Sequence, residues 1–158
     1  MVNYWIFVVK DHIHMGKMIP AREVLADRVR SKFWSLSARA RNLKRLEKGD
    51  KVLFYITGSR EKGFMGRGVL AGPSHLMTEE QRFHVIGEPS TGFDHAVDFE
   101  EAEIWDRVIT LDEVKDEMPL LRRMGNPSRA FRGAIRRITE EDYGVVVRAY
   151  EGSRKGLE

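Results

Sequence analysis

The sequence has no cysteine among its 158 residues, which excludes disulfide bonds, thiolate zinc sites and cysteine nucleophiles. This absence fits a reducing compartment, and we expect a cytoplasmic protein. No apolar run reaches the length of a membrane span. The first run, Tyr4 to Val9, ends at Lys10-Asp11-His12 and lacks the basic flank of a signal peptide. We interpret it as a buried first strand, and we expect no membrane partner.

Acidic residues are missing from two long stretches, although the chain has a formal net charge of only +3. No Asp or Glu lies between Asp27 and Glu47, or between Glu117 and Glu140. The basic residues in these gaps are Arg28, Arg30, Lys32, Arg39, Arg41, Lys44, Arg45, Arg122, Arg123, Arg129, Arg132, Arg136 and Arg137. If the two segments converge they form a phosphate-binding face, and if they do not they are solvated surfaces. We expect them on one side of the molecule.

The length and a hydrophobic content of 42% suit one domain with its own core. We place this domain at residues 1–151 and a flexible tail at 152–158. Residue patterns predict helices over 18–36, after 37, over 112–118 and from 139, and strands over 3–9, 51–57, 64–71, 82–86, 101–109 and 132–138. The order has no βαβ alternation. It predicts an α+β fold, in which a mostly antiparallel sheet of five to six strands curls into a barrel with flanking helices.

No catalytic or cofactor-binding constellation is present. The glycines of Gly66-Arg67-Gly68 match the spacing of a dinucleotide fingerprint, but Gly72-Pro73 follows where a helix should begin. These glycines instead suit a bent strand or a ligand lying against bare backbone. The pair in His12-Ile13-His14 has no third ligand at a matching spacing, which favours surface histidines over a metal site. We expect no cofactor, no metal and no enzymatic activity.

Trp34 is the most informative aromatic residue. If Phe33 continues the helical stripe of Leu25 and Val29, Trp34 lies about 100° round the helix from that stripe. An aromatic side chain there, next to a basic segment, suits stacking on a nucleobase. The alternative is a core tryptophan, because tryptophan is usually well buried.

Five segments in order then resemble a known family. They are Asn3-Tyr4-Trp5, Trp34-Ser35, Gly49-Asp50-Lys51-Val52-Leu53-Phe54-Tyr55, Gly63-Phe64-Met65-Gly66, and Arg132-Gly133 with Ile138-Thr139-Glu140-Glu141-Asp142-Tyr143. Together they look like the EVE domain of the PUA-like superfamily, which is related to YTH domains, the readers of N6-methyladenine. The resemblance implies a PUA-like β-barrel with a pocket on its side. It also implies recognition of modified bases in DNA or RNA, with no defining catalytic activity.

The resemblance implies site residues by position. Trp34 and Ser35 match the pocket, with Asn3 and Trp5 as first-strand neighbours, and Tyr55, Thr57 and Phe64 lie on strands that border it. YTH domains have a second cage aromatic, for which the candidates are Phe83, Phe93 and Trp105. We expect phosphates to contact the basic residues Arg30, Lys32, Arg39, Arg41, Arg129 and Arg132.

The predicted function is therefore a non-enzymatic module that holds a modified or flipped base of RNA or DNA in an aromatic pocket. Stacking supplies about 1–3 kcal/mol per base. One alternative is a receptor for a free nucleoside or another small molecule, which needs the pocket but no basic rim. A nucleotide-processing enzyme is another, and it would need a carboxylate or histidine of perturbed pKa in the pocket. On the first interpretation, the Trp34 indole lines a pocket open to solvent.

Overall fold

The computed structural model describes residues 2–84 and 94–155. The strands are β1 (Tyr4–Lys10), β2 (His12–His14), β3 (Lys17–Ile19), β4 (Phe33–Leu36), β5 (Lys51–Thr57), β6 (Lys62–Leu70), β7 (His75–Leu76), β8 (His95–Ile109) and β9 (Ile135–Ile138). The helices are α1 (Ala21–Ser31), α2 (Glu79–His84), α3 (Leu111–Val114), α4 (Pro119–Arg123) and α5 (Glu140–Lys155), with 3-10 turns η1 (Leu43–Arg45) and η2 (Pro127–Phe131). Within this part of the chain, no helix is long and apolar enough to cross a membrane.

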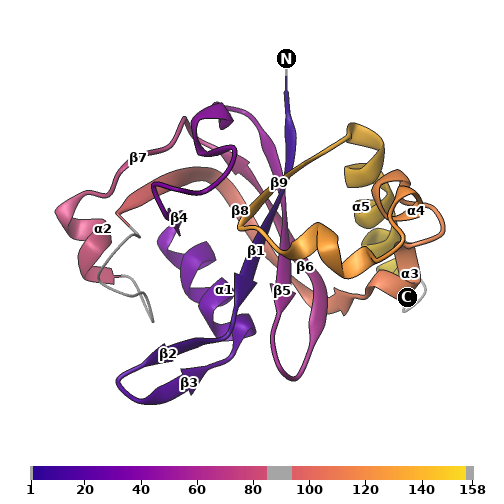
Figure 1. The fold of residues 1–158 in the computed structure, drawn as a ribbon, viewed down its shortest axis with the longest axis horizontal. Coiled ribbons are helices and arrows are strands. Elements are labelled where there is room, and N and C mark those ends of the chain that lie inside the picture. Colours follow the sequence, from indigo (N-terminus) through magenta and orange to yellow (C-terminus); the bar gives the residue numbers. More distant parts are fainter. Residues whose placement is uncertain (1, 85–93, 156–158) are drawn as a thin grey trace.

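One curled sheet organises the molecule (Figure 1). Its strand order is β4-β8-β6-β5-β1-β9, and β7 pairs with β8 beside this path. All of these pairs are antiparallel except β1 with β5, which run parallel. The long strand β8 pairs with β4 through its first residues and with β6 through the rest, so it carries the sheet round its bend. The predicted α+β fold with a curled sheet is confirmed, and the sheet is mixed because β1 and β5 run parallel.

Both faces of the central strands are buried. Trp5, Phe7 and Val9 of β1 point into one core cluster, which α1 covers, whereas Ile6 and Val8 point into another. The second cluster is covered by α3, α4 and α5, on the other side of the sheet (Figure 1). A strand buried on both faces needs apolar residues at every position. This explains the unbroken apolar run at the beginning of the sequence.

The glycines of β6 accommodate a neighbouring side chain. A Cβ atom on Gly66 would lie 2.3 Å from the Glu103 carbonyl oxygen and 3.0 Å from the Phe54 ring. A Cβ atom on Gly68 would also lie 3.0 Å from that ring. The pairing of β5 with β6 shifts register between Phe54 and Tyr55, as a bulge does. The bare backbone that the glycines provide is therefore covered by Phe54.

The helix predicted over 18–36 is wrong at its ends. The observed α1 ends at Ser31 because Lys32 adopts a left-handed conformation, with φ of 60°, which closes the helix. The next four residues form β4, and all four are buried. Trp34 therefore lies on a strand, and the helical geometry that placed it off the buried stripe does not apply.

Several other predicted elements also differ. Residues 82–84, predicted as a strand, belong to α2 instead. Only η1 forms where a basic helix was expected after residue 37, and α4 forms at Pro119 because proline is tolerated in a first helical turn. The last helix reaches Lys155, past the predicted start of the tail at residue 152. The predicted strand over 85–86 and the loop over 87–93 lie outside the described residues.

A fully buried carboxylate fixes the beginning of β1. Asp50 accepts a hydrogen bond from the Trp5 indole N–H at 2.9 Å and from the Asn3 and Glu47 backbone N–H groups at 3.0 Å each. The carboxylate therefore joins β1 to the turn that leads into β5. A buried charge is tolerated when donors surround it in this way.

Asp50→Ala should lower the free energy of unfolding by about 3 kcal/mol, because three N–H groups lose their acceptor, two of them backbone groups. Urea unfolding followed by circular dichroism measures this change. Asp112→Ala is the control, because Asp112 is exposed and its carboxylate forms a surface ion pair with Lys115, three residues along the chain. It should change stability by no more than about 0.5 kcal/mol. Equal losses in both variants would contradict the structural role of Asp50.

Candidate functional site

A cavity of about 220 Å³ opens where five segments meet. These are the end of β1, the beginning of β2, the last turn of α1, the middle of β4 and the residues that precede β9. The lining residues are Val8, Val9, Lys10, His12, Arg28, Trp34, Ser35, Arg132, Gly133 and Ala134. The Val8 N–H donates to the Ala134 carbonyl at 2.9 Å, which fixes the segment before β9 against β1.

Trp34 forms a wall of this cavity from within the core. Its side chain is only 1% exposed and stacks on Phe54, with ring centroids 5.2 Å apart and an interplanar angle of 14°. Phe7 lies at 5.4 Å in a tilted arrangement, and Phe99 meets the indole edge-on at 6.3 Å. The glycine backbone of β6 holds Phe54, which in turn holds Trp34. The indole is thus rigidly placed.

Arg28 forms another wall of the cavity. Its guanidinium carbon lies 4.6 Å from the centroid of the Trp34 ring, a cation–π distance. One of its terminal nitrogens donates to the Ser35 backbone carbonyl at 3.2 Å. The residue is almost fully buried. A guanidinium plane and an aromatic ring are the two side-chain surfaces on which bases stack.

The cavity is electropositive. Lys10, Arg28 and Arg132 line it, and none of the described lining residues is acidic. Arg28 belongs to the first acid-free segment and Arg132 to the second, so at least one residue from each converges on the same cavity. Low-dielectric walls strengthen the attraction of such a site for anionic ligands.

The sequence model of the EVE domain matches residues 3–149. The chain belongs to the EVE domain family. A comparison with curated protein sequences gives no match.

Solved structures share the fold of this EVE domain. A hypothetical protein from Leishmania major has a TM-score of 0.67 at 20% identity, with 98% of each chain covered. Human THYN1 in complex with DNA containing 5-methylcytosine has a TM-score of 0.60 at 18% identity, covering 94% of this chain and 98% of that one. The YTH domain of Zygosaccharomyces rouxii MRB1 in complex with N6-methyladenosine RNA has a TM-score of 0.58 at 14% identity, covering 95% and 90%. At these identities the likeness establishes the fold.

Two site residues expected on the first strand of the EVE domain lie away from the cavity. Trp5 is fully buried and bonded to Asp50, and Asn3 accepts a hydrogen bond from Arg137 at 3.0 Å. Trp5 precedes the cavity residue Val9 by four positions, which is about 13 Å along a strand. Both residues therefore anchor the strand that carries the cavity.

The expected residues of the hairpin strands face elsewhere as well. Tyr55 and Phe64 belong to the second core cluster, where Tyr55 stacks on Phe131 at 3.8 Å. Burial raises the pKa of Tyr55 to about 12, so its phenol stays neutral. Thr57 is half-buried beside Lys10 in the strand register. The structure brings only Trp34, Ser35 and Arg132 of the predicted set to the cavity.

The described candidates for a second cage aromatic do not line the cavity. Trp105 lies in the second core cluster and stacks on Tyr150 at 4.4 Å. Phe83 is 91% exposed on α2, and Phe93 lies outside the described residues. The plane nearest to Trp34 in the cavity is the guanidinium of Arg28. Sequence reasoning had assigned Arg28 only to a basic surface segment.

Of the six basic residues predicted to contact phosphates, Arg132 lines the cavity and the other five do not. Arg30 is exposed and pairs with Asp27 at 3.1 Å, and Lys32 forms the left-handed end of α1. Arg39, Arg41 and Arg129 are exposed but do not line the cavity. Sequence reasoning also missed Val8, Val9, Lys10, His12 and Ala134, for which the sequence gives no signal beyond the nearby Arg132-Gly133 motif.

Trp34→Ala should lower the free energy of unfolding by about 3–5 kcal/mol, the usual cost of removing a buried aromatic side chain. This corrects the expectation that the indole lines a pocket open to solvent, because the residue is 1% exposed. Thermal unfolding measures the change. Phe83→Ala, at a highly exposed aromatic residue, is the control and should have almost no effect. A loss below about 1 kcal/mol for Trp34→Ala would place the indole outside the core.

Proposed function

We propose that this EVE domain is a non-enzymatic nucleic-acid-binding module that holds one modified or flipped base in the cavity beside Trp34. The observation that carries the proposal is the meeting of Trp34 and Ser35 with Arg28 and Arg132 in one cavity. The basic residues come from separate acid-free segments of the sequence. Two solved relatives of the same fold were crystallised with methylated nucleic acid, one with DNA and one with RNA.

The size and lining of the cavity suit a base rather than a whole nucleotide. Its volume, about 220 Å³, lies below the range of about 300–1,000 Å³ that accommodates drug-sized ligands. The Arg28 guanidinium, which lies over the Trp34 indole, supplies a planar surface for stacking at the cavity. The sugar and phosphates of a bound nucleotide would then lie outside, near the basic residues at the rim.

The basic rim favours this function over a receptor for a free, uncharged nucleoside. Arg132 is exposed at the cavity, where it gains nothing from a neutral ligand but can contact a phosphate. An enzyme acting on the base would need a general acid or base. Among the described lining residues His12 is the one imidazole, and no carboxylate lies in the lining to accompany it.

Ala134→Leu tests the cavity directly. Ala134 is exposed and lines the cavity, so a larger side chain fills the space without entering the core. We expect the variant to bind modified and unmodified oligonucleotides with equal affinity. This affinity should be lower than that of the wild-type protein for the modified oligonucleotide, and it should still fall as the salt concentration rises. The measurement is fluorescence anisotropy at fixed salt, with matched oligonucleotides that carry cytosine or 5-methylcytosine, and adenine or N6-methyladenine. Ala38→Leu, at another exposed alanine, is the control. Unchanged preference in Ala134→Leu would exclude this cavity.

Arg132→Ala tests the rim. It should weaken binding of modified and unmodified oligonucleotides alike, and should lower the salt slope of the affinity by about one. Titrations at several salt concentrations give this slope. A slope equal to that of the wild-type protein would show that Arg132 makes no phosphate contact.

A further inference from the structure

The hairpin of β2 and β3 ends in an unusual turn. His14 pairs with Lys17, so Met15 and Gly16 alone form the connection. Their φ angles are 52° and 79°, the positive values that a two-residue type I′ turn requires. Asparagine, aspartate and glycine are favoured at both positions, because they tolerate the left-handed conformation. Here a methionine occupies the first of them.

The side chain of Met15 makes little packing contact with the rest of the protein. Its side chain is 90% exposed, although a large apolar residue is normally buried. A non-glycine residue held in the left-handed region also disfavours the native hairpin, and such residues cluster at functional sites. The sequence therefore presents a flexible apolar side chain at the tip of a ribbon at some cost in local stability.

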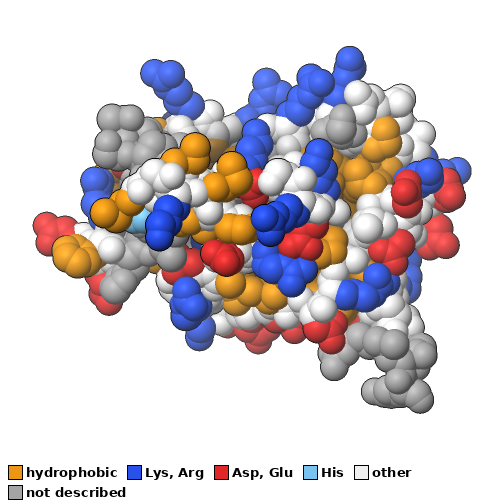
Figure 2. Space-filling view, turned by 90° about the horizontal axis from the view of Figure 1, so that it is seen from below, with side chains coloured by type: hydrophobic (Ala, Val, Ile, Leu, Met, Phe, Trp, Pro, Cys, Tyr) orange, Lys and Arg blue, Asp and Glu red, His pale blue; other side chains and the backbone are white. Residues whose placement is uncertain are grey.

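The ribbon behind the tip is amphipathic. Ile13 and Met18 are cross-strand partners on one face, and they are 71% and 61% exposed. His14 and Lys17 lie on the other face, and no acid occurs from residue 12 to residue 22. Figure 2 shows the side of the molecule that carries the hairpin, where hydrophobic side chains lie among Lys and Arg, with acidic side chains also present on this face. This mixture suits an apolar insertion flanked by phosphates.

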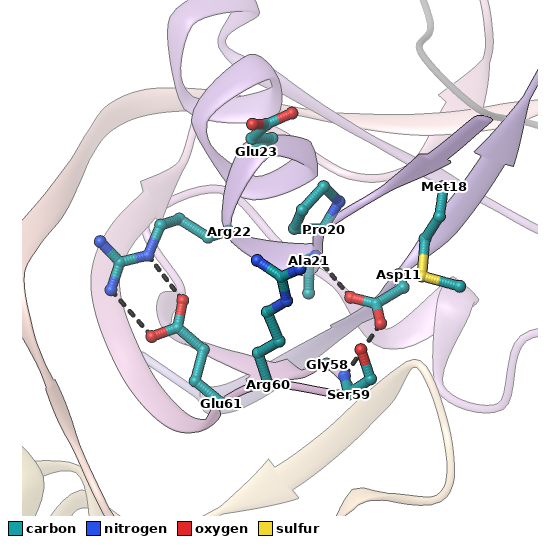
Figure 3. A pocket seen from close by; sticks show the side chains of 10 residues that line it. All are labelled: Asp11, Met18, Pro20, Ala21, Arg22, Glu23, Gly58, Ser59, Arg60 and Glu61. Atoms are coloured by element: carbon teal, nitrogen blue, oxygen red, sulfur yellow. Dashed lines mark hydrogen bonds and ion pairs between the residues drawn. The ribbon is translucent and has the colours of Figure 1, made fainter.

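The root of the hairpin is rigidly held. Asp11, just before β2, accepts hydrogen bonds from the Ala21 N–H at 2.8 Å and the Ser59 N–H at 2.9 Å, and these bonds lower the pKa of its carboxyl group (Figure 3). Beside it, Arg22 and Glu61 form a two-pronged ion pair at 2.6 and 2.8 Å. The hairpin is therefore fixed to α1 and to the loop between β5 and β6.

The hairpin also adjoins the base cavity. Lys10 and His12, at its root, line that cavity. Met15 lies three residues further along, which is about 10 Å of extended strand. The tip is thus within reach of the base step next to a nucleotide whose base occupies the cavity.

We propose that Met15 is a wedge that enters the base stack of duplex DNA and fills the place of the base held in the cavity. The proposal rests on the function proposed above, and it names the substrate as a double strand. Methionine is among the side chains that proteins insert between base steps. Filling the gap offsets the cost of unstacking the extruded base.

The shape of the hairpin favours DNA. A two-stranded β-ribbon can enter a groove of B-form DNA, and apolar wedges are inserted between base steps from the minor groove. The deep groove of A-form RNA is too narrow for side chains to enter, and a single strand has no stacked partner to be replaced. The wedge is therefore needed only where a base must leave a DNA duplex.

Met15→Asn separates the wedge from the fold. Asparagine followed by glycine is the preferred type I′ pair, so the melting temperature should stay the same or rise. Affinity for a short DNA duplex with one N6-methyladenine or 5-methylcytosine should fall about tenfold, while affinity for the same strand without its complement should not change. Placing the modified base opposite a mismatch should shrink the loss, because a mispaired base is easier to extrude.

Two control variants sharpen the result. Met15→Leu keeps an apolar tip and should retain duplex binding, and Leu76→Asn removes an exposed apolar residue of β7 and should have no effect. The wedge proposal would be overturned if Met15→Asn lost affinity equally for duplex and single-stranded DNA, or if it kept full affinity for duplex DNA. An equal loss of affinity for duplex RNA would also overturn it. Failure of the wild-type protein to bind any of the oligonucleotides would instead overturn the proposed function.

Discussion

The architecture depends on how β1 is held in the centre of the sheet. The buried Asp50 carboxylate fixes its beginning through Trp5 and Asn3, and parallel pairing with β5 fixes its register along its full length. Alternate side chains of β1 then enter opposite cores, so a slip of one residue would exchange the two sets. The end of the same strand supplies Val8, Val9 and Lys10 to the cavity. A hydrogen-bond cluster at one end of β1 thereby determines the geometry of the site at the other.

Sequence patterns predicted the elements whose formation depends mainly on neighbouring residues in the chain. The apolar first strand, the hairpin of β5 and β6 and the last helix were recognised because propensity and burial agree there. The end of α1 was not, since Phe33-Trp34-Ser35-Leu36 follows a helical segment without a glycine or proline between them. Only the left-handed conformation of Lys32 marks the boundary, and lysine carries no signal for it. The four residues after it become β4 because pairing with β8 buries all of them, a long-range contact that no window of sequence contains.

The candidate site shows the same division. Trp34, Ser35 and Arg132 were predicted because a resemblance to a family supplied their positions, not because their spacing identified a pocket. Arg28 was assigned to the surface by its charge, yet its guanidinium lies buried over the indole. Tyr55 and Phe64 were expected at the pocket, but the bulge after Phe54 and the alternation along β5 direct them into the other core. Which face an aromatic residue takes is set by sheet register, and register is a property of strand pairs.

The two ends of the proposed binding surface are under opposite constraints. Trp34 belongs both to the core and to the cavity wall, so any substitution that reshapes the stacking plane also disturbs the contacts with Phe54 and Phe7. Trp34 is therefore the position of the proposed site that tolerates substitution least. In this proposal, changes in preference between modified bases would arise at rim residues such as His12 and Ala134. At Met15 the side chain is free of the core, and the backbone alone bears the strain. Substitution there alters contact with a ligand without a loss of packing, so the tip can change with the substrate while the wall stays the same.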